Sequence, residues 1–323
     1  MKLFYWYDAC RKAASIIRDT VPEPYRSRTF PGIIGDIKAL PPAKARSLFM
    51  RKKGLGRQYA YLYLSSGIDD GRGYQACATE ALDAVLGPDR DAIIRGAILD
   101  VGCAVGVTAG ILELDRVTGF DLFPDLLKTA RLVDSMTGRE HRYVAADMTR
   151  DWPFGCEFET VVCGLVCHHL KEQPDVTAFF SSLNSVLHPG GYAIITLPAG
   201  SVASAARFEN LAFALENFGF SADRTRSGLV LSIDDPRSLF WMFLLVARKT
   251  SPVRSPVFID PGFGFHRYRT SEKREEKGEK ARATVAADRR VKHEAFRLVP
   301  LDEMAERYGD RELVFSTLTA VDN

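Results

Sequence analysis

Short apolar runs alternate with stretches of helical periodicity along the middle of the chain, and this alternation limits the fold more than any other feature. Five of these runs occupy residues 97–102, 117–121, 143–147, 158–166 and 192–198. Runs of this length are typical of buried strands, and the segments between them can form crossover helices. The pattern predicts a doubly wound α/β fold with a mostly parallel, Rossmann-like sheet and helices on both faces.

Two further apolar runs, at 228–233 and 239–247, complete an expected sheet of seven strands. Only residues 234–238 separate the two runs, which is enough for a hairpin and too short for a crossover helix. We therefore expect the last strand to be antiparallel.

The first part of the chain, residues 1–90, has the periodicity of helices. We predict a helical extension or lid there, followed by a sheet domain at 91–250. An apolar face near the start of the chain contains Leu3, Phe4, Tyr7, Ala14 and Ile17. A later helix is expected at 72–86, and the proline-rich basic stretch 39–59 is expected to be a surface crossing or a mobile lid.

Residues 251–323 are predicted to form a charged, partly disordered C-terminal extension. Charged side chains dominate 268–293, which favours a solvated helix or a disordered segment. The apolar pattern returns near Phe296. We nevertheless expect the sheet domain to fold without the residues after about Val253.

The chain has 43 Lys and Arg against 41 Asp and Glu, and this net charge of +2 gives no general reason to expect a nucleic-acid or membrane partner. Its six cysteines lack the dense spacing of a disulfide scaffold, which favours reduced thiols. The longest apolar run is too short to span a membrane, and the first residues lack an uninterrupted signal core. These features predict a cytoplasmic protein without a membrane partner.

A glycine turn follows the first expected strand, with Asp100, Gly102, Ala104 and Gly106 at alternate positions. Such a turn lets backbone N–H groups approach a ligand at the carboxyl edge of the sheet, where open α/β folds bind ligands. A dinucleotide fingerprint requires a small residue at the position of Val107, so NAD is disfavoured.

Acidic residues also end the next two expected strands. Asp121 follows the second strand, where a carboxylate can accept hydrogen bonds from both hydroxyls of a ribose. Asp147 follows the third strand and could accept from an exocyclic adenine amine, beside an apolar contact from Met148. The alternative role of Asp147 is to cap a turn. The two acids together favour an adenosine-type cofactor.

In these features residues 97–249 resemble the class I S-adenosylmethionine-dependent methyltransferases, especially the type 11-like group that modifies small molecules. LDVGCAVG resembles the first family motif, TGFDLFPDLLKTAR the second, AADM the third, FETVVCGLVCHHL the fourth and LNSVLHPGGYAIITLP the fifth. Ala104 replaces a usual glycine, and Glu159 replaces a usual aspartate. The resemblance implies S-adenosylmethionine as cofactor and a small molecule as substrate.

The resemblance also implies roles for individual residues. Those that it places at the cofactor are Asp100, Gly102, Ala104, Gly106, Asp121, Leu122, Asp147, Met148 and Cys163. Among them, Asp121 would hold the ribose, Leu122 would pack on the adenine ring, and Cys163 ends the strand that borders cofactor and substrate.

Residues 163–170, CGLVCHHL, contain two cysteines and two histidines. A zinc site needs four converging ligands, and the sequence has no second Cys/His cluster, so we expect no metal. Cys163 and Cys167 are better explained as small buried hydrophobes. Adjacent side chains on an extended segment point in opposite directions, so one of His168 and His169 could face the substrate as a general base, or both are structural.

The expected function is transfer of a methyl group to an O, N or C nucleophile of a small molecule. Candidate substrate contacts are Tyr59, Tyr61, Tyr63, the loop after Leu197 and the insertion at 207–220. One alternative is an RNA methyltransferase that uses the basic residues of 267–292, and another is a cofactor-binding module without methyl transfer. The methyl acceptor and the oligomeric state do not follow from the sequence.

Overall fold

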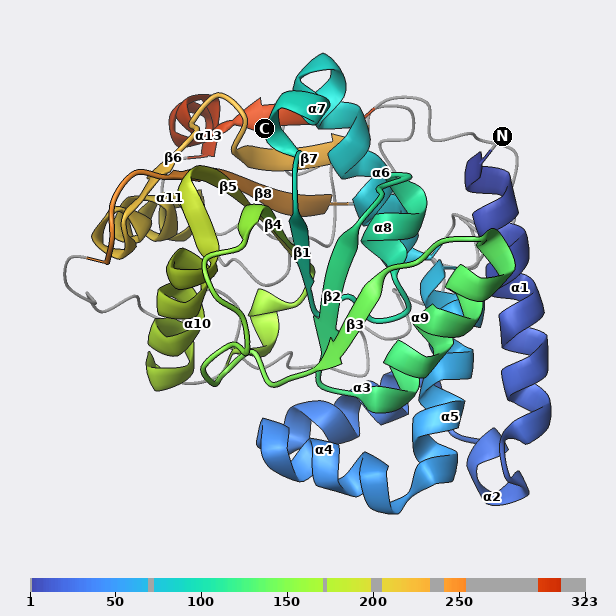
Figure 1. The fold of residues 1–323 in the computed structure, drawn as a ribbon. Helices are drawn as coiled ribbons and strands as arrows, with labels where there is room; N and C mark the ends of the chain where they lie inside the picture. Colours follow the sequence, from blue (N-terminus) through green and yellow to red (C-terminus); the bar gives the residue numbers. More distant parts are fainter. Residues whose placement is uncertain are drawn as a thin grey trace.

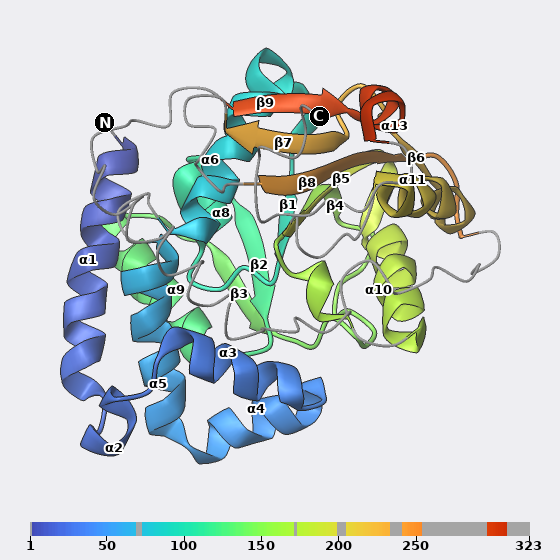
Figure 2. The ribbon, with the colours of Figure 1, turned by 180° about the vertical axis from the view of Figure 1, so that it is seen from behind.

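The computed structural model describes residues 2–68, 73–170, 173–198, 205–232, 241–253 and 296–308. A twisted sheet forms its centre, and N-terminal helices lie against one side (Figure 1 and Figure 2). The strands within the described residues are β1 (Ile98–Val101), β2 (Val117–Asp121), β3 (Arg142–Ala145), β4 (Phe158–Gly164), β5 (Leu187–Pro198), β6 (Phe220–Ala222), β7 (Gly228–Ser232), β8 (Trp241–Lys249) and β9 (Phe296–Pro300).

The first five strands are parallel and lie in the order β3-β2-β1-β4-β5. β8 follows β5 in the sheet and runs antiparallel to it. β7 is antiparallel to β8, and β9 is antiparallel to β7 at the lateral edge. The predicted α/β fold with a mostly parallel sheet is confirmed, and so is the antiparallel direction of the strand at 239–247.

The predicted number of seven strands is wrong, because the described part of the chain has nine. β6, which pairs with β8, has only three residues, too few for a recognisable alternation. β9 follows a long charged stretch and lies far from its partner β7 in the sequence. Neither strand therefore has a local signal of its own.

Helices cover both faces of the sheet. One face carries α6 (Tyr74–Leu86), η3 (Gly87–Asp89), α7 (Arg90–Ile93) and α8 (Val107–Ile111), and the other carries α10 (Gln173–Val186), α11 (Ala205–Ala214) and η6 (Leu215–Phe218). β8 shows the two cores most clearly, because its side chains alternate between them. Met242 and Leu244 pack with α6, whereas Phe243 and Leu245 pack with α10 and α11.

The N-terminal layer consists of α1 (Lys2–Thr20), α2 (Glu23–Arg26), α3 (Phe30–Ala39), α4 (Pro42–Arg51), α5 (Lys53–Leu62), the π-helix η1 (Tyr63–Ile68) and the first turns of α6, whose Ala76 packs with them. It shares a core with α8 and with α9 (Pro124–Thr137). Trp6 packs so closely on α8 that a Cβ atom at Gly110 would lie 2.0 Å from the indole ring. The predicted apolar face of α1 is wrong for Phe4, which is 68% exposed, because Trp6 is buried instead.

The basic stretch 39–59 forms most of α4 and α5. Pro42 occupies the first turn of α4, where its fixed φ and missing N–H are tolerated. Phe49 and Tyr59 from these helices are buried. The proposed role of this stretch as a lid stays a prediction.

The C-terminal segment, β9 followed by α13 (Leu301–Tyr308), belongs to the main core. Val299, Leu301 and Met304 are each only 1% exposed and pack in the cluster that includes α10 and α11. This burial contradicts the expectation that the residues after Val253 add little to the sheet domain. The predicted solvated segment at 268–293 lies outside the described residues, and the domain boundaries stay predictions.

In the part of the chain that the structure describes, no helix has both the length and the apolar character needed to cross a bilayer.

Candidate functional site

The glycine turn between β1 and α8 has the left-handed backbone that its sequence suggests. Gly102, Ala104 and Gly106 have φ values of 67°, 49° and 81°. At Gly102 an added Cβ would lie 2.5 Å from the Val166 side chain, so glycine is required there on both steric and conformational grounds. Ala104 adopts this backbone without being glycine, which is uncommon for a residue with a side chain.

Asp121 at the end of β2 holds this turn in place. Its carboxylate accepts the Ala104 N–H at 3.1 Å and the Phe123 N–H at 2.9 Å. Burial raises the pKa of Asp121 to about 6, although these backbone hydrogen bonds act in the opposite direction. Because each carboxylate oxygen can accept more than one hydrogen bond, Asp121 keeps capacity for a hydroxyl ligand.

Asp100 on β1 is 1% exposed, and neither of its carboxylate oxygens has a hydrogen-bond partner among the described residues. Burial raises its pKa to about 7, the nearby Thr108 hydroxyl lowers it in part, and the charge of Asp121 adds to the rise. A buried acceptor without a donor is costly, so this position favours a ligand that supplies hydrogens.

The residues expected around adenine lie after β2 and β3. One oxygen of Asp147 accepts the Thr149 N–H at 2.9 Å and the Thr149 hydroxyl at 2.8 Å, so Asp147 does cap a turn. The Met148 carbonyl accepts the Trp152 indole N–H at 3.2 Å. Leu122 and Met148 are half-buried, and their contact with a cofactor stays a prediction.

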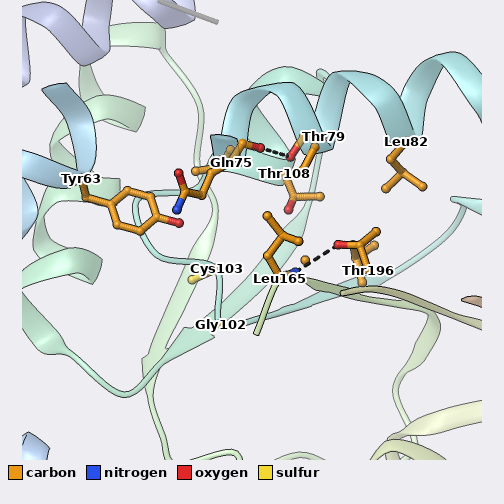
Figure 3. Close-up of a pocket in the computed structure, with 13 residues that line it drawn as sticks. Tyr63, Gln75, Thr79, Leu82, Gly102, Cys103, Thr108, Leu165 and Thr196 are labelled. Carbon is orange, nitrogen blue, oxygen red and sulfur yellow. Dashed lines mark hydrogen bonds between the residues drawn. The ribbon is translucent and has the colours of Figure 1, made fainter. Parts of the chain in front are cut away.

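A cavity of about 30 Å³ lies where the carboxyl ends of β1, β4 and β5 meet the N-terminal layer. Its sheet side includes Gly102, Cys103, Val107, Thr108, Val162, Gly164, Leu165 and Thr196. Its other side consists of Tyr63, Gln75, Ala78, Thr79 and Leu82. Figure 3 shows the side chains of Tyr63 and Gln75 pointing toward one another beside the turn at Gly102 and Cys103.

Tyr63 was among the residues expected at the substrate, whereas Gln75 and Thr79 were missed. The available signal was their spacing, because residues four apart on the predicted helix 72–86 share one face. Two polar residues therefore lie on a face that also carries Ala78 and Leu82.

Of the other tyrosines, Tyr59 is buried in an aromatic cluster, with its ring centroid 5.7 Å from those of Phe49 and Phe123, and Tyr61 is half-buried. Burial is the main cause of the raised pKa values of Tyr59 and Tyr63, and the charge of Asp121 contributes to both. The two phenols therefore lie near Asp121 and stay protonated at neutral pH.

The loop after β4 is not extended, because Cys167, His168 and His169 form the 3-10 helix η4 (Cys167–His169). The expectation that the two imidazoles point in opposite directions is wrong: their ring centroids are 4.0 Å apart with planes inclined by 39°. Neither histidine lines the small cavity. Their proposed catalytic role stays a prediction.

Cys163 and Cys167 are buried, with 3.1 Å between their sulfur atoms. Burial, together with the neighbouring Cys167, raises the pKa of Cys163 well above that of an ordinary thiol. Both residues thus have the environment of small buried hydrophobes. Among the described side chains, no group of three or more His, Cys, Asp and Glu residues is arranged to hold a metal ion.

Residues 99–195 match a family model described as "Methyltransferase domain". A ubiquinone biosynthesis O-methyltransferase of Xanthomonas euvesicatoria pv. vesicatoria is 34% identical over 99 residues, which cover 29% of this chain and 39% of that protein. An uncharacterized methyltransferase of Schizosaccharomyces pombe is 30% identical over 105 residues, covering 29% and 36% of the two chains. The chain thus spans about two fifths of the length of the curated relatives it matches.

Among solved structures, a didemethyltoxoflavin N1-methyltransferase of Burkholderia thailandensis, with S-adenosylhomocysteine bound, is similar at 19% identity with a TM-score of 0.44. The alignment covers 66% of this chain and 92% of that one. An N-methyltransferase of Bradyrhizobium japonicum WM9, also with S-adenosylhomocysteine, has 16% identity and a TM-score of 0.39, with 54% and 86% of the two chains covered. The match at residues 99–195 spans the glycine turn, Asp121 and Asp147, so this stretch of the chain has the pattern of a methyltransferase domain.

Proposed function

We propose that the chain is an enzyme that transfers the methyl group of S-adenosylmethionine to an O, N or C nucleophile of a small molecule. The main support for this proposal is the position of the Asp121 carboxylate. It accepts a hydrogen bond from the Ala104 N–H and so fixes the glycine turn at the carboxyl edge of β1 and β2. A buried acid beside a left-handed turn fits a ligand that carries both hydroxyl and amine donors.

The residues present fit this cofactor. Asp121 would accept from the ribose hydroxyls, and the backbone of Gly102, Ala104 and Gly106 would line the ribose and methionine parts. Asp100 offers buried acceptors without donors, which the amino group of the methionine part would satisfy. Leu122, Asp147, Met148 and Cys163 would complete the site on the adenine side and at the end of β4.

When bound, the cofactor supplies a methyl group that its sulfonium has already activated. The protein's own contribution is to hold the acceptor in line with that group and to exclude water. Leu82, Leu165 and Val107 give the cavity apolar walls suited to this exclusion. An imidazole of His168 or His169 would take the proton from the attacking hydroxyl or amine.

The cavity volume implies that the N-terminal layer moves during binding. Small-molecule sites have volumes of roughly 300–1,000 Å³, whereas this cavity has about 30 Å³. Tyr63 and Gln75 form the side that does not belong to the sheet. We therefore expect η1 and the start of α6 to shift outward when the cofactor and the acceptor enter.

The matched region does not select the acceptor. The matched region, residues 99–195, contains the expected cofactor residues. The expected substrate residues Tyr59, Tyr61 and Tyr63 lie outside it.

Binding and turnover test the proposal together. Titration calorimetry should detect S-adenosylhomocysteine binding to the purified chain, with NAD bound more weakly or not at all. Conversion of S-adenosylmethionine to S-adenosylhomocysteine with a panel of phenols, amines and carboxylic acids then distinguishes an enzyme from a binding module. Failure to bind S-adenosylhomocysteine would refute the assignment.

A further inference from the structure

We propose that Gln75, from the N-terminal layer, holds the amino-acid end of the cofactor: its side-chain carbonyl accepts a hydrogen bond from the ammonium group. This inference rests on the proposed function. It assigns a binding role to a residue outside the matched region 99–195.

Gln75 has an unsatisfied acceptor at the cavity. Its Oε1 atom is buried and has no hydrogen-bond partner among the described residues. Burying an amide oxygen without a donor is unfavourable. A side chain kept in such a position at the wall of a cavity is explained if a ligand supplies the missing hydrogen.

Two donors at the cavity, the Thr79 hydroxyl and the Leu165 N–H, use their hydrogens elsewhere and leave the Gln75 oxygen unpaired. The Thr79 hydroxyl donates to the Gln75 backbone carbonyl at 3.0 Å, and the Leu165 N–H donates to the Thr196 hydroxyl oxygen at 3.0 Å. Both contacts are drawn in Figure 3. Thr108 lines the same cavity and lies near enough to Asp100 to affect its pKa. The unpaired Oε1 atom of Gln75 thus belongs to a residue of the cavity wall, and the unpaired carboxylate of Asp100 lies near Thr108, another residue of that wall.

Hydrogen-bonding capacity and charge together favour an ammonium group at Gln75. An ammonium has three donors and no acceptor, the complement of a site with surplus acceptors. Its positive charge also suits the buried carboxyl of Asp100.

A pair of ligands tests this assignment. S-adenosylhomocysteine has the amino-acid end, and 5′-methylthioadenosine lacks it but keeps the ribose and adenine. Gln75→Leu should weaken S-adenosylhomocysteine about tenfold and change 5′-methylthioadenosine less than about twofold, both measured by calorimetry. Equal weakening of the two ligands, or no weakening of either, would overturn the inference.

Two further variants make the outcome decisive. Gln75→Glu places a carboxylate where the carbonyl lies, so S-adenosylhomocysteine should bind at least as tightly as to the wild type. Weaker binding would show that this side chain faces the carboxylate of the ligand and would also overturn the assignment. Thr79→Val alters the same helix face without touching the Gln75 side chain and should affect both ligands equally.

The inference and the proposed function fail in different ways. If the wild-type chain binds neither adenosine ligand, the cofactor assignment itself is wrong. If the wild type binds both ligands and the Gln75 variants do not separate them, only the role of Gln75 is wrong. Should Gln75→Leu not fold, the Gln75→Glu measurement alone decides.

Discussion

Two segments outside the matched domain pack on its sheet, and they do so at different edges. The N-terminal layer lies at the carboxyl ends of β1, β4 and β5, where it provides Tyr63, Gln75 and Thr79 to the cavity. The C-terminal segment adds β9 to the lateral edge and provides no residue to that cavity. An extension at the lateral edge can stabilise a sheet, whereas one at the carboxyl edge can also shape its ligand site. We therefore expect C-terminal changes to affect mainly stability and N-terminal changes to affect mainly binding.

The largest expected effect is on stability, at the C-terminal segment. Deletion of the residues after Val253 would remove the buried side chains of Val299, Leu301 and Met304 and leave β7 without its outer partner. Because each lost core side chain costs about 2–5 kcal/mol, we expect the truncated chain to lose cooperative thermal unfolding. Calorimetric melting of the two chains is the measurement.

A point substitution refines this first prediction. Met304→Ala should lower the free energy of unfolding by about 2–5 kcal/mol, because Met304 is 1% exposed. Glu306→Ala, at an exposed position on the same helix, is the matched control and should change it by less than about 0.5 kcal/mol. Met304→Ala should leave the affinity for S-adenosylhomocysteine near the wild-type value, and a tenfold loss would show that the lateral edge communicates with the site.

The second largest effect is on turnover, and it tests whether the catalytic base is a histidine of η4 or a residue of the N-terminal layer. If an imidazole of η4 accepts the proton, His168→Gln or His169→Gln should lower turnover by about 10² while cofactor affinity stays near that of the wild type. Tyr63→Phe is the counterpart in the N-terminal layer. The Tyr63 phenol is protonated at neutral pH, as tyrosine ordinarily is, and burial raises its pKa further, so it is a poor base and its loss should reduce turnover less. Normal turnover in both histidine variants at every pH would mean that the rings are structural and that positioning alone accounts for the rate.

The third effect is on cofactor affinity at Asp121, where the domain meets the N-terminal layer. Asp121→Ala should weaken S-adenosylhomocysteine by about 10- to 10²-fold, because the ribose hydroxyls lose their acceptor. Thermal melting of the same variant should fall as well, since the Ala104 and Phe123 N–H groups also lose their partner. Asp121→Asn retains one acceptor oxygen and should have an intermediate affinity. Unchanged affinity in a folded Asp121→Ala protein would contradict the ribose role.

The sequence predicts the parallel half of this fold well, because β1, β2 and β4 each coincide with a short, largely apolar run, and β1 is followed by a glycine turn while β2 ends in an acid. These are local signals. The local sequence does not predict β9 or the position of Gln75 at the cavity. β9 forms by pairing with β7, and Gln75 lies at the cavity beside the turn after β1, and both of these partners are distant in the chain. The predicted orientation of His168 and His169 was wrong for a different reason. Adjacent side chains point in opposite directions only on an extended backbone, and here the backbone forms the 3-10 turn η4.

The smallest expected effect is a change of protonation at Asp100. Burial raises its folded-state pKa to about 7, whereas an exposed aspartic acid titrates near 4 in the unfolded chain. The folded state therefore binds more protons between these values, so the contribution of Asp100 to stability decreases as pH rises from about 4 to about 7.

A cation placed beside the carboxyl of Asp100 would lower that pKa and release a proton. Binding of S-adenosylhomocysteine near pH 6.5 should then release a fraction of a proton, measured by calorimetry in two buffers of different ionisation enthalpy. The release should be smaller for 5′-methylthioadenosine and absent in Asp100→Asn. Equal proton release for both ligands would mean that the ammonium group does not reach Asp100. The ammonium contact would then belong to Gln75 of the N-terminal layer and not to the carboxyl of Asp100.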